Sequence, residues 1–171
     1  MRAAVEYEVD KLASGDIARA STSPWVFPVV MVRKMDGGLR MCVDYRRLKF
    51  VTKFECFLLP RLDESFDAFA VTTVFSNFDL AMAYHQVPVK PSDVEKIAFI
   101  MHVGLFKMQK RPFDLCNAPS TYQRFMAGVL QRLIGRICHA NLHDVIVFSK
   151  KSDRNTLLIF DLYSTEFALL V

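Results

Sequence analysis

The chain has 171 residues, which is the length of about one domain. Hydrophobic residues make up 52% of it, and 15 Phe stand against only 6 Gly, so the composition excludes a disordered or low-complexity chain. The formal net charge of +4 is compatible with a polyanionic partner but does not require one. No apolar run approaches the roughly 20 residues that cross a bilayer.

Cysteine usage and the N-terminus bear on the compartment. The four cysteines (Cys42, Cys56, Cys116 and Cys138) form no CxxC pair, which favours reduced thiols. The first residues are acidic and amphipathic and do not have the pattern of a signal peptide. We therefore expect an intracellular, cytoplasmic protein that binds no membrane. The sequence leaves the oligomeric state open.

The N-terminal third predicts a helix and then a β-hairpin. Apolar residues at helical spacing indicate the helix, and a glycine ends it: Val5, Val9, Leu12 and Gly15. The β-rich segment 26–34 is followed by Met35-Asp36-Gly37-Gly38, in which Asp-Gly supplies the positive φ angles of a tight turn. Residues 39–44 form the expected return strand.

The remainder of the chain alternates between short helical and strand patterns. Pro60 precedes a helical pattern at Leu62, Phe66 and Phe69. The run Ser92-Asp93-Val94-Glu95 has the form of a capping box. Further elements are expected as strands at 97–102 and 105–109, joined at Val103-Gly104, a helix at about 119–134 that Gly135 stops, and a hairpin at 138–149. Helices on one face of an antiparallel sheet make an α+β domain.

Two apolar segments each end in an acidic residue. Residues 74–78 lead into Asp79, and residues 137–142 lead into His143-Asp144, which an apolar strand follows. Carboxylates at strand ends or hairpin tips are held rigidly, and two of them brought together supply the oxygen ligands that Mg²⁺ prefers. Such a cage is the core of a two-metal phosphoryl-transfer site.

Several motifs in register resemble the reverse transcriptases of gypsy-type LTR retrotransposons from about Val5 to Lys150. The resemblance lies in segments 23–30, 33–37 and 40–48, in Phe75-Ser76-Asn77-Phe78-Asp79-Leu80 with residues 83–87 after it, in Pro112-Phe113-Asp114-Leu115-Cys116-Asn117-Ala118-Pro119-Ser120-Thr121-Tyr122-Gln123, and in Asn141-Leu142-His143-Asp144 with the apolar strand to Ser149. It implies a fingers-palm polymerase fold: an antiparallel palm sheet with helices on one face, plus a fingers β-hairpin. Residues 1–150 would form the fingers and palm. Residues 151–171 would form a degenerate helical segment, without a thumb.

The resemblance also implies an RNA-directed DNA polymerase. It would extend a primer on an RNA or DNA template with dNTPs, using two Mg²⁺ ions or alternatively Mn²⁺. Asp79 and Asp144 would bind the metal, whereas on local pattern alone they could equally be a helix N-cap and a turn residue. His143 stands where the family has a catalytic carboxylate, and imidazole is a poor ligand for Mg²⁺. We therefore expect impaired catalysis.

A second group would handle the nucleotide by resemblance: Lys34, Arg40, Leu80, Tyr84 and Phe113. Lys34 and Arg40 would grip the triphosphate through charge-assisted contacts, although a solvated hairpin face would carry the same residues. By resemblance Tyr84 would lie under the sugar of the nucleotide. The alternative is an ordinary half-buried tyrosine. Phe113 would pack beside the sugar or belong to the core.

Other departures from the family pattern, like the one at His143, favour a loss of polymerase activity. Asn141 replaces Tyr, Asp114 replaces Gly, and Lys49 replaces Asn. The alternative is accordingly a non-catalytic remnant of a retroelement that at most binds nucleic acid. A zinc site built from Cys138, His139 and His143 is disfavoured because HxxxH spacing presents a metal-binding face on a helix, and this segment is predicted as a hairpin.

Overall fold

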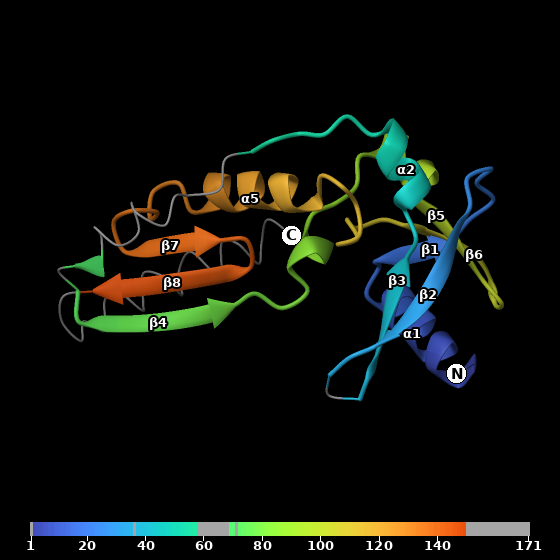
Figure 1. Ribbon diagram of the computed structural model, residues 1–171, viewed down its shortest axis with the longest axis horizontal. Helices are drawn as coiled ribbons and strands as arrows, with labels where there is room; N and C mark the ends of the chain where they lie inside the picture. The colour runs from blue at the N-terminus through green and yellow to red at the C-terminus, as the bar shows by residue number, and fades with distance from the viewer. Residues whose placement is uncertain (1, 36, 58–68, 71, 150–171) are drawn as a thin grey trace. The chain divides into compact units, whose positions relative to one another are not determined.

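The computed structural model describes residues 2–35, 37–57, 69–70 and 72–149 (Figure 1). The chain divides into two compact units. Unit 1 comprises Met1–Phe54 and Tyr84–Ala118, and unit 2 comprises Glu55–Ala83 and Pro119–Val171. The predicted helical pattern after Pro60 and the segment 151–171 lie outside the described residues, apart from Phe69.

Unit 1 is built on a five-stranded sheet with the order β1-β6-β5-β2-β3. Its elements are α1 (Arg2–Ser14), β1 (Ala18–Ala20), β2 (Phe27–Arg33), β3 (Leu39–Val43), α2 (Arg46–Val51), α4 (Pro91–Val94), the 3₁₀ turn η2 (Glu95–Ile97), β5 (Ala98–Met101) and β6 (Gly104–Met108). The predicted N-terminal helix, the hairpin β2–β3 and the strand pair β5–β6 are confirmed. The β2–β5 pair is parallel, so this sheet is mixed.

Unit 2 holds a three-stranded antiparallel sheet with the order β4-β8-β7. Its elements are β4 (Val74–Asp79), α5 (Ala118–Val129, which begins at the last residue of unit 1), β7 (Cys138–Asn141) and β8 (Asp144–Ser149), and the 3₁₀ turn η1 (Ala83–Gln86) continues into unit 1. The helix α5 runs alongside this sheet (Figure 1). The predicted α+β class, with an antiparallel palm-type sheet, a helix beside it and a separate hairpin, is confirmed.

The core of unit 1 positions the hairpin β2–β3 through Tyr45. Its ring packs edge-on against Phe27, with ring centroids 5.0 Å apart, and its hydroxyl donates a hydrogen bond of 2.9 Å to the carbonyl of Ile97. Tyr45 is 2% exposed, and Phe99 beside this core is fully buried. Burying both rings removes a large apolar area from water, and the buried hydroxyl keeps a partner.

Two sequence-based boundaries are wrong, for physical reasons. Pro91 opens α4, with Lys90 as the N-cap and no side-chain capping bond, so Ser92 does not form the predicted capping box. Proline takes the first helical position well because it has no N–H to lose there. The helix α5 ends at Val129 rather than near Ile134, and tight turns follow in which Leu130 and Leu133 remain buried. The apolar spacing therefore continues beyond the regular helix.

The helices in the described part of the chain include none long and apolar enough to span a bilayer.

Candidate functional site

The end of the β4–β8 ladder brings the two predicted metal-binding carboxylates together. Asp79 is the last residue of β4 and lies directly opposite Asp144, the first residue of β8. Directly opposite residues in an antiparallel pair have Cβ atoms about 4.5–5.5 Å apart and project to the same face. Asp79 caps no helix, so the helix N-cap alternative for this residue is wrong.

The turn between β7 and β8 places a histidine beside both carboxylates. Leu142 and His143 form a two-residue turn, in which Leu142 has a φ of +53°. The Nδ1 atom of His143 lies 3.3 Å from Oδ1 of Asp79 and 3.6 Å from Oδ1 of Asp144. One ligand atom from each of the three residues falls within 4.8 Å of the others.

The imidazole is oriented by the backbone rather than by a hydrogen bond of its own. The carbonyl of His143 accepts a hydrogen bond of 2.9 Å from the N–H of Leu80, which extends the β4–β8 ladder by one step. The His143 Nδ1 atom is shielded from solvent and makes no hydrogen bond in the described structure, although the side chain as a whole is 43% exposed. A ring nitrogen therefore faces two carboxylate oxygens at separations that suit a shared ligand.

A buried glutamine fixes the turn to the helix beside it. Gln123 of α5 is 1% exposed; its Nε2 donates to the carbonyl of Ala140 at 3.1 Å, and its Oε1 accepts from the N–H of Leu142 at 2.7 Å. These two hydrogen bonds clamp both sides of the β7–β8 turn, and with it His143. The sequence motif contained Gln123, but no local pattern revealed this role, because it depends on the packing of α5 against the hairpin.

The predicted triphosphate-binding residues gather in unit 1. Lys34 and Arg40 line one open hollow of about 470 Å³ on the β2–β3 hairpin. The guanidinium carbon of Arg40 lies 5.9 Å from the ring centroid of Phe113, which is 37% exposed. Phe113 is therefore not a core residue. Tyr84 is half-buried, and burial raises its pKa.

Asp114 ties this region to the hairpin. Its Oδ2 accepts a hydrogen bond of 3.0 Å from the N–H of Val43 at the end of β3. Burial raises the pKa of Asp114, and the Val43 hydrogen bond and the charges of Lys49 and Arg40 oppose that rise. Asp114, where the family pattern has a glycine, thus places a carboxyl group near Arg40 and Lys49.

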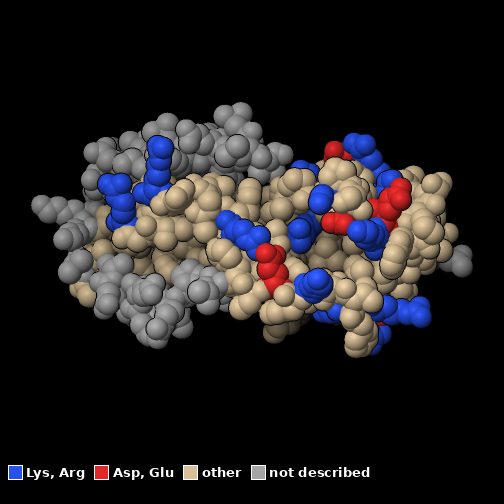
Figure 2. Space-filling model, turned by 90° about the horizontal axis from the view of Figure 1, so that it is seen from above, with Lys and Arg blue, Asp and Glu red and all other residues tan. Residues whose placement is uncertain are grey.

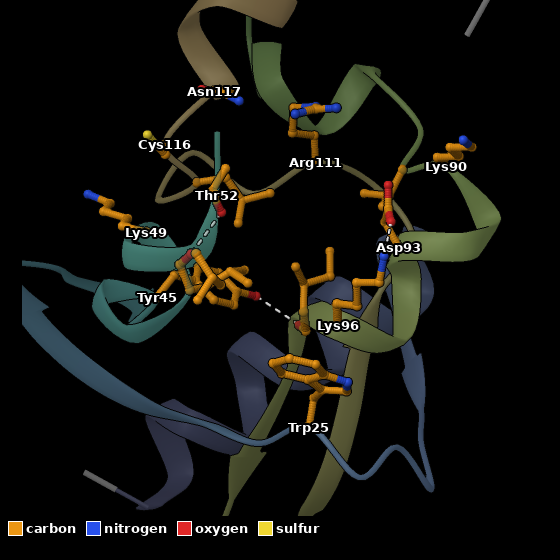
Figure 3. Close-up of a pocket in the computed structure, with 15 residues that line it drawn as sticks. Trp25, Tyr45, Lys49, Thr52, Lys90, Asp93, Lys96, Arg111, Cys116 and Asn117 are labelled. Carbon is orange, nitrogen blue, oxygen red and sulfur yellow. Dashed lines mark hydrogen bonds and ion pairs between the residues drawn. The ribbon is translucent and has the colours of Figure 1, made fainter. Parts of the chain in front are cut away.

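A second hollow in unit 1 combines cations with an aromatic ring. Its volume is about 400 Å³, and Trp25 lies across it from Arg111, with Lys49 and Lys90 at its sides (Figure 3). Asp93 also borders it and is paired with Lys96 at 2.6 Å. On the face shown in Figure 2, Lys and Arg side chains are spread widely, whereas Asp and Glu gather at a few places.

The disfavoured zinc site is not formed by the described residues. Cys138 is fully buried, and burial raises the pKa of its thiol to about 12. His139 lies edge-on to Phe69, with ring centroids 6.4 Å apart, and does not belong to the Asp79–His143–Asp144 group.

Comparison with known proteins now decides the family. Residues 32–165 match the family described as "Reverse transcriptase (RNA-dependent DNA polymerase)". The chain belongs to the reverse transcriptase family. It is 34% identical over 158 residues to the "Retrovirus-related Pol polyprotein from transposon opus" of Drosophila melanogaster, a match that covers 90% of this chain and 16% of that polyprotein. The polyprotein from transposon gypsy of the same organism is 32% identical over 152 residues, with 85% and 15% covered.

Solved structures of reverse transcriptases share the fold. The foamy viral protease-reverse transcriptase in complex with dsDNA superposes with a TM-score of 0.79 at 16% identity, covering 95% of this chain and 34% of that one. The native prototype foamy virus protein gives a TM-score of 0.76 at 17% identity, with 95% and 22% covered. The predicted fingers-palm fold and the resemblance to gypsy-type elements are both confirmed. The chain spans about one sixth of the length of the curated relatives it matches.

Proposed function

We propose that this chain is the fingers-and-palm part of an RNA-directed DNA polymerase and that His143 impairs its chemical step. The observation that carries the proposal is the cross-strand pairing of Asp79 with Asp144 beside the turn that holds His143. In this assignment residues 1–150 supply fingers and palm, and 151–171 form a separate C-terminal segment. Carboxylates at this position are placed to hold the cations that nucleotidyl transfer requires.

The incoming nucleotide would be a dNTP held mainly by unit 1. Lys34 and Arg40 line the same hollow and offer charge-assisted hydrogen bonds to phosphate oxygens. The ring of Phe113 lies next to the Arg40 guanidinium and would pack against the sugar, as would Tyr84. The part of Leu80 in this nucleotide site would be indirect, because its backbone N–H donates a hydrogen bond to the carbonyl of His143.

A template-primer is the second proposed partner. The foamy viral relatives have structures in complex with dsDNA and with an RNA/DNA hybrid. In this chain the hollow between Trp25 and Arg111 offers an aromatic face for a base, and the cations around it offer contacts to phosphate. Binding that does not weaken as salt rises would count against this partner.

The donor set at the palm does not fit the pair of Mg²⁺ ions that the family resemblance implies. Mg²⁺ requires oxygen ligands in near-ideal octahedral geometry, and the third protein donor here is the Nδ1 of His143. Replacing a carboxylate with imidazole also removes one of the negative charges that would offset two dications. Asp79 and Asp144 would be the Mg²⁺ ligands, but these two carboxylates alone do not complete a site for two Mg²⁺ ions.

The impairment is large rather than a small adjustment. The electrostatic effect of a catalytic metal is several kcal/mol, and each ~1.4 kcal/mol changes a rate tenfold. If roughly 3–4 kcal/mol of that effect is lost, the rate falls by about 10²–10³. The second candidate function is a remnant that binds nucleic acid without polymerising. It corresponds to a complete loss of the polymerisation rate and rests on the same His143.

Primer extension with a restored carboxylate tests the polymerase proposal. His143→Asp should extend a labelled primer on an RNA template with Mg²⁺ and dNTPs, and the double variant His143→Asp with Asp79→Asn should not. Extension that persists without Asp79 would show that it does not come from this site. No extension by His143→Asp, with template-primer binding intact, would favour the non-catalytic remnant.

A further inference from the structure

We infer that Asp79, His143 and Asp144 form a binding site for a single first-row transition dication, and that this site prefers Zn²⁺ and Mn²⁺ to Mg²⁺. The inference deepens the proposed function, because it takes the palm carboxylates as metal ligands. It differs from the two-Mg²⁺ site of the family resemblance in the number of ions, in their kind and in the residue that selects them.

The spacing of the donor atoms fits one ion. Nitrogen and oxygen ligands that lie about 2.1 Å from a divalent ion are roughly 3.0–3.4 Å from each other in octahedral or tetrahedral arrangements. The Nδ1 atom of His143 lies 3.3 Å and 3.6 Å from the Oδ1 atoms of Asp79 and Asp144. The carboxylate oxygens of Asp79 and Asp144 lie within 4.8 Å of each other, so side-chain rotation would bring all three donors to one cation.

The two adjacent negative charges of Asp79 and Asp144 favour the binding of a cation. Asp79 and Asp144 are directly opposite in the ladder, where like charges destabilise a pair of strands. In the described part of the chain, the ion pairs of both carboxylates involve only His143, and each requires that ring to be protonated. A bound dication would remove this repulsion.

The imidazole decides which cation is preferred. Nδ1 is shielded from solvent and has no hydrogen-bond partner in the described structure, so the neutral tautomer that carries its proton on Nε2 would offer the Nδ1 lone pair to a metal. Imidazole suits Zn²⁺ and carboxylate suits Mn²⁺, so this mixed donor set accepts both ions, whereas Mg²⁺ requires oxygen ligands in near-ideal octahedral geometry. Among first-row transition dications, affinity at such a site rises from Mn²⁺ through Fe²⁺, Co²⁺ and Ni²⁺ to Cu²⁺ and is lower again for Zn²⁺.

The donors are held in place before the ion arrives. The ladder fixes the two aspartates, the Leu80 N–H holds the His143 carbonyl at 2.9 Å, and Gln123 clamps the turn. The remaining coordination positions face solvent, since the Asp79 side chain is 78% exposed and that of Asp144 is 50% exposed. Water or a phosphate oxygen could occupy those positions.

Binding of Mn²⁺ to the full chain, without primer or dNTP, tests the inference. The electron paramagnetic resonance signal of free Mn²⁺ disappears on binding, and its titration gives both stoichiometry and Kd. We expect one Mn²⁺ per chain, displaced by Zn²⁺ at stoichiometric concentration and not by an equal concentration of Mg²⁺. His143→Ala should weaken Mn²⁺ binding by at least about tenfold, and His143→Asp should shift the preference toward Mg²⁺.

His102→Ala is the matched control, because His102 is a partly exposed histidine of unit 1 that faces Glu6 and lies outside the site. Circular dichroism of each variant verifies that it is folded. Equal Mn²⁺ affinity in the wild type and His143→Ala, two ions per chain, or Mg²⁺ binding as tight as Mn²⁺ binding would each overturn the inference. None of these results depends on polymerisation, which the His143→Asp extension assay tests separately.

Discussion

Replacing Gln123 with methionine isolates the hydrogen bonds that clamp the β7–β8 turn. Methionine nearly matches glutamine in volume and remains compatible with a buried site, but it can neither donate to the Ala140 carbonyl nor accept from the Leu142 N–H. Each buried backbone group left without a partner costs about 1–3 kcal/mol. Because Leu142 is only partly buried and water can reach it, we place the loss at about 2–3 kcal/mol in the free energy of unfolding.

Urea unfolding followed by circular dichroism measures that loss, and the same exchange at Gln131 is the control. Gln131 is exposed and follows the end of α5, so Gln131→Met should change the stability by less than about 0.5 kcal/mol. Amide hydrogen exchange adds a local readout, since the Leu142 N–H should lose protection in Gln123→Met only. Stability within about 0.5 kcal/mol of the wild type, with the Leu142 amide still protected, would refute the clamp.

Two further predictions concern Asp114 and Gly128. Burial raises the pKa of Asp114, so the folded chain retains this proton at pH values where the unfolded chain has lost it, and the ionised carboxylate costs stability as the pH rises from near 4 through the folded-state pKa. Asp114→Asn should therefore gain stability relative to the wild type over that window, which urea titrations at a series of pH values would measure; a constant difference would contradict the burial argument. Gly128 lies inside α5, and an added Cβ would meet no atom within 4 Å, so Gly128→Ala should raise the unfolding free energy by about 0.5–1 kcal/mol, and a loss would show that the helix is strained there.

Strand ends and turns were predictable from the sequence because local chemistry determines them. Gly37 has the positive φ that the predicted turn of the β2–β3 hairpin requires, and Asp79 and Asp144 fall at strand termini because the apolar run of β4 ends at Asp79 and that of β8 begins after Asp144. The three-stranded ladder then brings the two aspartates to one point. Family resemblance added the roles of Lys34 and Arg40, and the structure places both around one hollow.

Features that depend on tertiary packing could not be predicted. The end of α5 was placed five residues too late because Leu130 and Leu133 stay buried in turns and extend the helical apolar pattern. The clamp by Gln123 joins residues 17 and 19 positions apart, and the Asp114–Val43 hydrogen bond joins residues 71 positions apart. The orientation of His143 between both carboxylates likewise emerges only from the folded ladder and turn.

We propose that this chain is a reverse transcriptase palm in which the imidazole of His143 impairs the chemical step. The most direct test compares single-turnover primer extension in Mg²⁺ by the wild type and by His143→Asp on the same bound template-primer. We expect a rate at least about 100-fold higher for His143→Asp, with equal template-primer affinity. Equal extension rates for the two proteins would contradict it.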